Sequence, residues 1–350
     1  MMCFLKRIWF DLRRRVNRKF KVLEGLQQQS NLSLDNIVKE VEVAILAKKS
    51  VTGLTAKYKA LGGSNNLGFL RHTFVSQSLP KTQNNWITKF ALNKLLTRES
   101  FFLQWHQENI ETKKQFAPDW LTSGQLGKSN VSFVVLECLR PIKSPSFEQV
   151  AGLYRACKAG GDIFQTIKTT HTLPPLEPGS RIRDVLVHLV CQFDSPDASV
   201  FLDHYIKERN TLLSSFPTEM AHVQKTLKRI FLVIRENIHD YLGLVHGDFK
   251  ASNMMLSDEK KLKLIDFQYW CYGVRVWDIA FFLSKQKIDF QRSVPVFIEC
   301  LVLSEQEKKL LIFFYVVAVL LHPKPKQFHW QFKHQLLPAL MILNNERVRQ

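Results

Sequence analysis

Residues 246–253 read His-Gly-Asp-Phe-Lys-Ala-Ser-Asn, and residues 264–267 read Leu-Ile-Asp-Phe. Asp248, Asn253 and Asp266 are three polar side chains in largely apolar surroundings. A carboxylate can orient a hydroxyl group and accept its proton, whereas an amide oxygen and a second carboxylate are hard oxygen ligands that suit Mg²⁺. Phosphoryl transfer needs these two contributions and little covalent chemistry from the protein. The stretch therefore predicts Asp248 as a catalytic residue and Asn253 and Asp266 as metal ligands.

A hairpin is expected between the two halves of this stretch. Residues 254–256 and 262–265 have strand-like patterns on either side of a charged turn, Ser257–Lys261. Taken singly, a His-x-Asp sequence is often an ordinary turn and an Asp-Phe pair an ordinary strand end. Their order and spacing together indicate a phosphotransferase site.

The run His246–Leu256, followed by Leu264–Phe267 and then by Trp277–Ala280, resembles the aminoglycoside phosphotransferase and choline kinase group of small-molecule kinases. Gly247 stands where protein kinases carry Arg, and the short interval before Asp278 leaves no room for a long activation loop. The resemblance implies an α+β class with a bilobal protein-kinase-like fold, in which a small β-containing N-terminal lobe precedes a larger, mostly helical C-terminal lobe. It also implies ATP and Mg²⁺ as cofactors and the hydroxyl of a small molecule, sugar, glycan or lipid headgroup as the acceptor.

Two residues near the catalytic loop receive a structural role from the same resemblance. In that group the Asp of the Trp-Asp-x-Ala motif supports the catalytic loop, which assigns this task to Asp278. His246 is similar to a scaffold residue that holds backbone groups around the loop. The resemblance covers roughly residues 57–282 and is most specific over residues 243–277.

The resemblance also implies a phosphate-binding loop in the N-terminal lobe. Glycines allow the backbone to approach phosphate oxygens, and small polar residues add hydrogen-bond donors. A cluster of this composition is more often only a hairpin turn, so this alternative stays open. The expected loop residues are Gly62, Gly63, Ser64, Asn65 and Asn66.

A lysine and a glutamate are expected to form an ion pair beside the ATP phosphates. Lys89 lies in the strand-like run Asn85–Phe90, and a helix is predicted over residues 92–107. Glu99 lies on the apolar face of that helix, whereas Glu108 is nine residues further on and faces away. The alternative is that Glu99 lies on the helix surface.

A further predicted strand, Ser132–Leu139, leads to the connection between the lobes. The resemblance implies that adenine binds to the backbone of this connection, at Glu137 and Leu139. The expected organisation is a basic amphipathic extension over residues 1–50, a nucleotide-binding N-lobe over residues 51–140, and a C-lobe over residues 141–350 with the catalytic loop, the metal site and the acceptor site.

The chain is strongly basic. It has 49 Lys and Arg against 31 Asp and Glu, a formal net charge of +18. This excess favours a neutral or anionic acceptor over a polycationic one. Residues 1–21 contain eight Lys and Arg, one acid and an apolar stripe at helical spacing, which suits either an anionic membrane surface or packing on the protein itself. No specific nucleic-acid binding is expected, because basic and aromatic residues are not interleaved.

The cysteines and apolar runs favour a cytoplasmic protein, peripheral on the inner membrane face if residues 1–21 bind lipid. The longest apolar run, Leu310–Leu321, is too short to span a bilayer and predicts a buried helix. The start of the chain has no sustained apolar core of a secretory signal. The cysteines have no metal-site spacing and are interpreted as reduced thiols. They are Cys3, Cys138, Cys157, Cys191, Cys271 and Cys300.

A rival interpretation is a catalytically inactive kinase-like scaffold that binds nucleotide or a partner. The presence of Lys89, Asp248, Asn253 and Asp266 argues against it, because inactive members of such families usually lack at least one of them.

Overall fold

The computed structural model describes residues 24–49, 55–61, 67–75, 85–111, 115–168, 181–236, 238–286, 288–321, 323 and 325–345. The chain divides into two compact units, one formed by Met1–Arg140 with Leu256–Lys263 and the other by Pro141–Met255 with Leu264–Gln350. Residues 1–21 and the predicted loop residues 62–66 lie outside the described residues. The membrane role of the first segment and the phosphate role of the second stay predictions.

The first unit is built on a five-stranded antiparallel sheet in the order β1-β2-β3-β5-β4. The pairs follow a regular register, with Lys89 opposite Phe69 on one side and opposite Val134 on the other. A shift between Trp120 and Thr122 interrupts the register of the edge pair β4–β5. The strands are β1 (Thr55–Leu61), β2 (Gly68–Val75), β3 (Asn85–Leu92), β4 (Trp120–Gln125) and β5 (Val131–Glu137).

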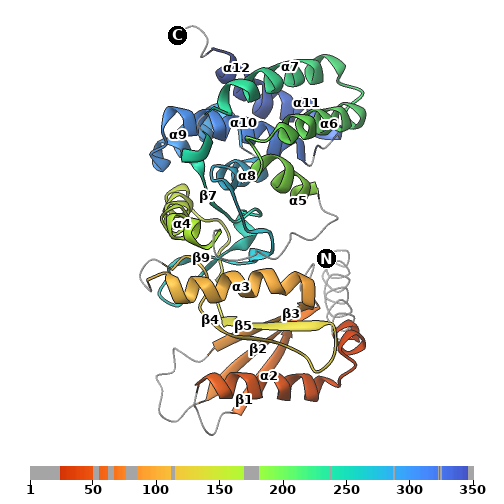
Figure 1. Cartoon of the computed structure of the whole chain (residues 1–350), viewed down its shortest axis with the longest axis vertical. Coiled ribbons are helices and arrows are strands. Elements are labelled where there is room, and N and C mark those ends of the chain that lie inside the picture. The colour runs from red at the N-terminus through yellow and green to blue at the C-terminus, as the bar shows by residue number, and fades with distance from the viewer. Residues whose placement is uncertain are drawn as a thin grey trace, which may run out of the picture. The chain divides into compact units, whose positions relative to one another are not determined.

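Two helices cover opposite faces of this sheet, α2 (Leu34–Lys49) and α3 (Asn93–Asn109) (Figure 1). Side chains alternate between the faces of a strand, so β5 can contribute to both layers. On the α2 side, Phe133 packs in a buried cluster with residues of α2 and with Phe90. This core includes helix residues from the range 1–50 that the sequence assigned to an extension.

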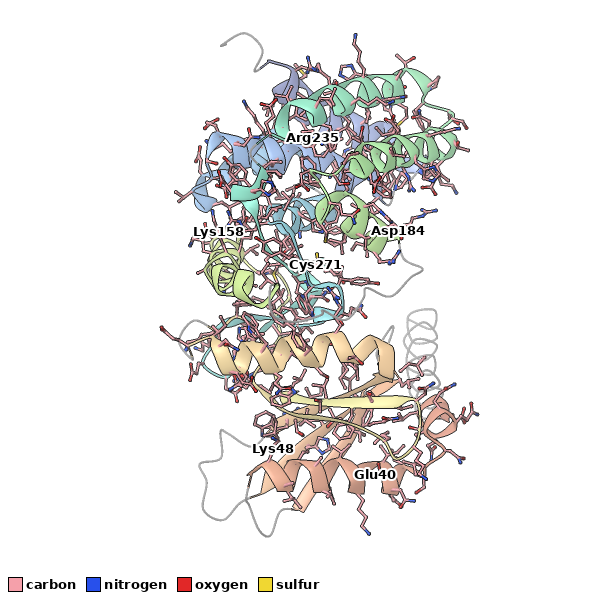
Figure 2. The ribbon with its side chains drawn as sticks, in the orientation of Figure 1. Glu40, Lys48, Lys158, Asp184, Arg235 and Cys271 are labelled. Atoms are coloured by element: carbon pink, nitrogen blue, oxygen red, sulfur yellow. The ribbon has the colours of Figure 1, made fainter. Side chains whose placement is uncertain are left out.

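The second unit is mostly helical. Helix α10 is buried along most of its length because residues 310–321 are apolar on every side. Tyr205 Oη donates to the carbonyl oxygen of Val317 at 2.8 Å, and Lys158, labelled in Figure 2, lies 2.8 Å from Glu307 Oε1. The helices are α4 (Phe147–Lys168), α5 (Arg181–Val185), η2 (Leu186–Val190), α6 (Pro196–Leu212), α7 (Pro217–Ile234), η3 (Ile238–Tyr241), η4 (Ala251–Asn253), η5 (Phe267–Tyr269), α8 (Trp277–Lys285), α9 (Phe290–Leu301), α10 (Glu305–Leu321), η6 (Pro325–Gln327), α11 (Phe328–Gln331), η7 (Phe332–Leu336) and α12 (Leu337–Asn345).

Short strands frame the loops that carry the candidate site. Strands β7 (Leu242–Val245) and β10 (Cys271–Val274) pair antiparallel, with Val245 opposite Cys271. Strands β8 (Met254–Leu256) and β9 (Leu262–Leu264) are neighbours in a small sheet and form the predicted hairpin. A short strand β6 (Arg140–Pro141) completes that sheet.

The sequence missed β1, β4, β6, β7 and β10. All of these except β1 have six residues or fewer, and short strands without strict alternation resemble loops. Residues 24–30 are helical, a turn follows, and α2 begins at Leu34. Buried Leu26 anchors the first of these two helices.

No helix in the described ranges is both long enough and apolar enough to cross a membrane. The cysteines that the structure describes, from Cys138 onwards, have free thiols.

Candidate active site

A glycine with a left-handed backbone shapes the loop that follows β7. Gly247 has φ +84°. A Cβ at this position would lie 2.6 Å from the carbonyl oxygen of Tyr269 and 2.9 Å from Leu186 Cδ1. A side chain is therefore excluded both by conformation and by space. The chain turns sharply at Gly247, and Asp248 follows the turn.

Asp278, in the first turn of α8, holds this loop by its backbone. Its Oδ2 accepts a hydrogen bond from His246 N at 2.7 Å, and its Oδ1 accepts one from Gly247 N at 2.9 Å. Trp277 Nε1 donates to the Gly247 carbonyl oxygen at 3.2 Å. Burial raises the pKa of Asp278 to about 7, although the two N–H donors favour the charged form. These hydrogen bonds are those expected of a structural support.

His246 connects the predicted catalytic loop with the strand that leads to Asp266. Its Nε2 lies 2.9 Å from the Ile265 carbonyl oxygen, which can only accept, so Nε2 carries the proton. Nδ1 accepts from Asp248 N at 3.2 Å. Burial lowers the pKa of His246, which keeps the ring neutral in this arrangement. With both ring nitrogens engaged, His246 orients the loop.

The carboxylate of Asp248 is buried and has two side-chain partners. Asn253 Nδ2 donates to Asp248 Oδ2 at 3.0 Å and to the Asp248 carbonyl oxygen at 2.9 Å. Lys250 Nζ lies 2.5 Å from the same Oδ2. The lysine side chain is 35% exposed, so the cation reaches the carboxylate from the solvent side.

Lys250 is a site residue that the sequence interpretation missed. It lies two residues after Asp248, between residues that we had selected, and its charge was the available signal. A basic side chain inside a loop that is expected to meet phosphate could have been singled out for that reason alone.

A backbone hydrogen bond joins Asn253 to the residue before Asp266. Ile265 N donates to the Asn253 carbonyl oxygen at 2.9 Å, directly before Asp266. Asp266 has φ 70° and ψ 58°, a left-handed conformation that costs a non-glycine residue about 1–3 kcal/mol and is typical of functional sites. Because Asn253 Nδ2 is bonded to Asp248, its Oδ1 is the group that can act as a ligand. One amide oxygen and one carboxylate fit Mg²⁺, which keeps several waters.

In the first unit, Lys89 and Glu99 form the predicted ion pair. Lys89 Nζ lies 2.6 Å from Glu99 Oε2, and both side chains are buried. Glu108 is exposed and accepts a hydrogen bond from Gln104 Nε2 at 3.0 Å. The helical face was therefore predicted correctly from the spacing of apolar residues in α3.

The structure describes only some of the other residues that we expected to bind nucleotide. Residues 62–66 lie outside the described residues, and the strands on either side of them, β1 and β2, pair antiparallel with Leu61 opposite Phe69. Glu137 is the last residue of β5, and half-buried Leu139 follows two residues later. The carboxylate of Glu137 accepts a hydrogen bond from Lys263, which the sequence interpretation did not foresee.

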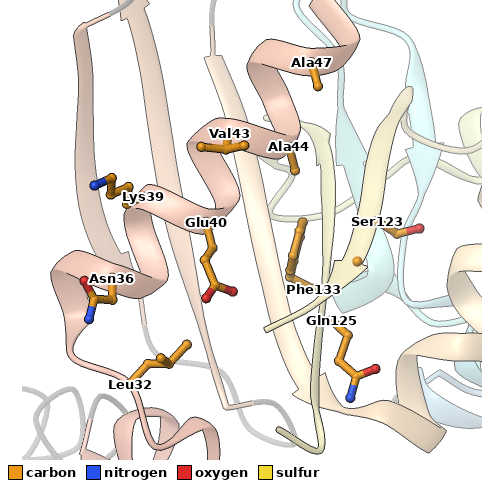
Figure 3. A pocket seen from close by; sticks show the side chains of 11 residues that line it. Leu32, Asn36, Lys39, Glu40, Val43, Ala44, Ala47, Ser123, Gln125 and Phe133 are labelled. Carbon is orange, nitrogen blue, oxygen red and sulfur yellow. The ribbon is translucent and has the colours of Figure 1, made fainter. Parts of the chain in front are cut away.

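A separate groove of about 630 Å³ lies between α2 and the strands β4 and β5 (Figure 3). Glu40 points into it, and its Oε2 accepts a hydrogen bond from Gly127 N at 2.9 Å. Leu32, Val43 and Phe133 supply apolar lining. None of the predicted site residues that the structure describes lines this groove, so it is treated separately from the candidate active site.

Comparison with known proteins agrees with the motif assignment. A model of the choline/ethanolamine kinase family matches residues 163–321, which include the predicted catalytic loop, the Asp-Phe pair and the Trp-Asp motif. No curated protein matches the chain.

Among solved structures, choline kinase from Cryptosporidium parvum Iowa II is similar with a TM-score of 0.51 and 11% sequence identity, covering 88% of this chain and 98% of that one. Ethanolamine kinase from Plasmodium vivax gives a TM-score of 0.45 and 15% identity, covering 94% and 95%. Spectinomycin phosphotransferase, solved with ADP and spectinomycin, gives 0.45 and 12%, covering 87% and 97%.

The resemblance to the aminoglycoside phosphotransferase and choline kinase group is thereby confirmed, with residues 163–321 as the matched segment. The fold class is confirmed as well: the chain has the kinase-like α+β fold of the choline kinase structure. The family whose model matches these residues, choline/ethanolamine kinase, is one of small-molecule phosphotransferases.

Proposed function

We propose that this chain is an ATP-dependent phosphotransferase that transfers the γ-phosphoryl group to a hydroxyl of a small molecule, sugar, glycan or lipid headgroup. The observation that carries the proposal is the loop of Asp248, Lys250 and Asn253. Three functional side chains of this loop are joined at one carboxylate oxygen, Asp248 Oδ2. Asp278 and His246 hold the backbone around them.

Each residue of the loop has a chemical role in this proposal. Asp248 aligns the acceptor hydroxyl for in-line attack and accepts its proton as the new P–O bond forms, while the bond from the γ-phosphorus to the β–γ bridging oxygen breaks and ADP leaves. Lys250 brings a positive charge beside that carboxylate, where the transferred group carries negative charge. Asn253 and Asp266 would hold Mg²⁺, which when bound neutralises charge on the phosphate oxygens. In the first unit, Lys89 would bind the α- and β-phosphates, oriented by Glu99.

The acceptor is proposed to be neutral or anionic. The net charge of +18 biases the electrostatic field against polycations, and the candidate loop adds Lys250 next to its single buried carboxylate. The matched family is described by choline and ethanolamine, which each carry one positive charge. These two compounds therefore belong in any test of this preference.

The decisive experiment is ATP turnover by the purified full-length protein with Mg²⁺ and a panel of acceptors. The panel contains neutral sugars, phosphorylated hydroxyl compounds, choline, ethanolamine and kanamycin-type polycations, with ADP release as the readout. We expect acceptor-dependent ADP release with a neutral or anionic compound. Turnover of the cations alone would contradict the acceptor preference, and Mg·ATP binding without any turnover would favour the inactive scaffold.

The ion pair of the first unit gives a prediction with a built-in control. Glu99→Gln keeps the shape of the side chain but removes the carboxylate charge 2.6 Å from Lys89 Nζ. We expect the KM for ATP to rise about tenfold or more, because a hydrogen bond between charged groups contributes about 1.5–3 kcal/mol. Glu108→Gln, on the exposed side of the same helix, should leave KM unchanged. If Glu108→Gln raised the KM for ATP as much as Glu99→Gln or more, the choice of Glu99 as the functional partner of Lys89 would be wrong.

A further inference from the structure

A buried lysine lies on the strand that leads to the proposed metal ligand Asp266. Lys263 is the middle residue of β9, and only 7% of it is exposed. A buried ammonium group is costly unless charged partners compensate for its lost hydration. The proposed function assigns no task to this cation.

Lys263 is held by two carboxylates that belong to the same unit. Its Nζ lies 2.6 Å from Glu137 Oε2 and 2.9 Å from Asp119 Oδ1. The two acids are joined to each other as well, because Asp119 N donates to Glu137 Oε2 at 3.3 Å and Glu137 N donates to the Asp119 carbonyl oxygen at 2.9 Å. Lys263 therefore completes a compact cluster that includes backbone and side chains.

The charges around Lys263 favour its protonated form. Burial alone would lower the pKa of Lys263, but the hydrogen bonds to Glu137 and Asp119 outweigh it and raise that pKa. The pKa of neighbouring His106, on α3, is lowered to about 3 by burial and by the charge of Lys263. His106 is thus neutral, and it accepts a hydrogen bond from Phe116 N at 3.3 Å.

Glu137 and Lys263 both lie close in sequence to residues that the proposed function uses. Glu137 is the last residue of β5 and stands at the start of the connection that we expect to meet adenine. In the other direction, only Leu264 and Ile265 separate Lys263 from Asp266, and Ile265 N is bonded to the Asn253 carbonyl oxygen. Lys263 is therefore only three peptide bonds from the proposed metal ligand Asp266 along the chain.

We propose that Lys263 is a positioning residue that locks β9 to Glu137 and Asp119 and thereby fixes the backbone that presents Asp266 to Mg·ATP. The proposal rests on the proposed function, since it specifies how that site is held. The strained left-handed conformation of Asp266 gives a reason for such a lock, because a strained residue keeps its conformation only when its surroundings hold it.

The test compares Lys263→Met, Lys263→Arg and the control Lys261→Met by calorimetric titration of the full-length protein with Mg·ATP. Lys261 lies on the same hairpin, but its side chain is 53% exposed and pairs with Glu259. We expect Lys263→Met to weaken Mg·ATP binding about 10-fold or more, the usual effect of losing a residue that orients a ligand. Lys261→Met should bind as the wild type does, and Lys263→Arg should recover most of the affinity because a guanidinium can bond both carboxylates.

A purely structural role would change the outcome. Loss of stability alone reduces the titrated fraction of binding-competent protein, whereas the dissociation constant of the folded fraction stays the same. Hydrogen exchange without nucleotide supplies an independent readout: amides of residues 262–266 should exchange faster in Lys263→Met and not in Lys261→Met.

An unchanged dissociation constant in Lys263→Met, with wild-type protein that binds Mg·ATP, would overturn the inference and leave the proposed function intact. Equal weakening by Lys261→Met would overturn it too. A wild-type protein that neither binds nor consumes Mg·ATP would instead contradict the proposed function itself.

Discussion

Asp248→Asn is expected to lower the rate of phosphoryl transfer about 100-fold or more, the usual contribution of a general base. The substitution keeps the size of the side chain and one acceptor oxygen but removes the negative charge. An amide cannot accept the proton of the acceptor hydroxyl, so the attacking oxygen stays a poor nucleophile. The measurement is kcat with a saturating acceptor.

The same variant should bind Mg·ATP with almost the wild-type affinity, because Asp248 is assigned to the acceptor and not to the nucleotide. Calorimetric titration separates these two properties. Asp203→Asn is a matched control, since Asp203 is a half-exposed acid on α6 that pairs with Lys228 at the surface. A variant that keeps more than about a tenth of the wild-type rate would contradict the role of Asp248 as the general base.

The contacts of Asp248 give a second possible cause for a fall in kcat, which other measurements can distinguish from lost proton transfer. Its carboxylate is bonded to Lys250 and Asn253, so the substitution also removes a charged partner of the lysine. If this rearrangement dominated, thermal stability and Mg·ATP affinity would change together with the rate. A selective loss of rate assigns the effect to proton transfer.

Much of the candidate site could be predicted because the decisive residues are close in sequence. Asp248 and Asn253 share one loop, and the short hairpin before Asp266 limits how far apart these three can lie. Lys89 and Glu99 were also accessible, since β3 and α3 are adjacent in the chain and a helix repeats every 3.6 residues. For residues this close in sequence, their spacing is enough to predict that their side chains lie near one another.

Long-range partners could not be predicted in this way. Lys263 and Glu137 are 126 residues apart, and nothing in either neighbourhood indicates the other. The same holds for part of the need for a glycine at Gly247, because the carbonyl oxygen of Tyr269 and Leu186 Cδ1 lie where a Cβ would be. Such pairings are set by how the elements fold together, which a single sequence does not reveal.

Asp266→Asn is expected to abolish most of the gain in ATP affinity that Mg²⁺ provides. The choice of asparagine follows from the backbone: Asp266 has φ 70°, and asparagine tolerates this left-handed region better than alanine does. The variant therefore removes the charge with little change in conformational energy. Asp258→Asn is the matched control, because this half-exposed acid lies in the adjacent hairpin and pairs with Arg140 at the surface, where ion pairs contribute little.

The measurement is a pair of calorimetric titrations with ATP, one with Mg²⁺ and one with a chelator. For wild type and Asp258→Asn, Mg²⁺ should tighten binding. For Asp266→Asn, this gain should fall about 100-fold, because a metal ion that neutralises phosphate charge contributes several kcal/mol and needs its carboxylate ligand. Binding without Mg²⁺ should not weaken, since the removed group is an anion that repels the phosphates. An unchanged affinity for Mg·ATP would show that Asp266 is not a metal ligand, whatever its conformation.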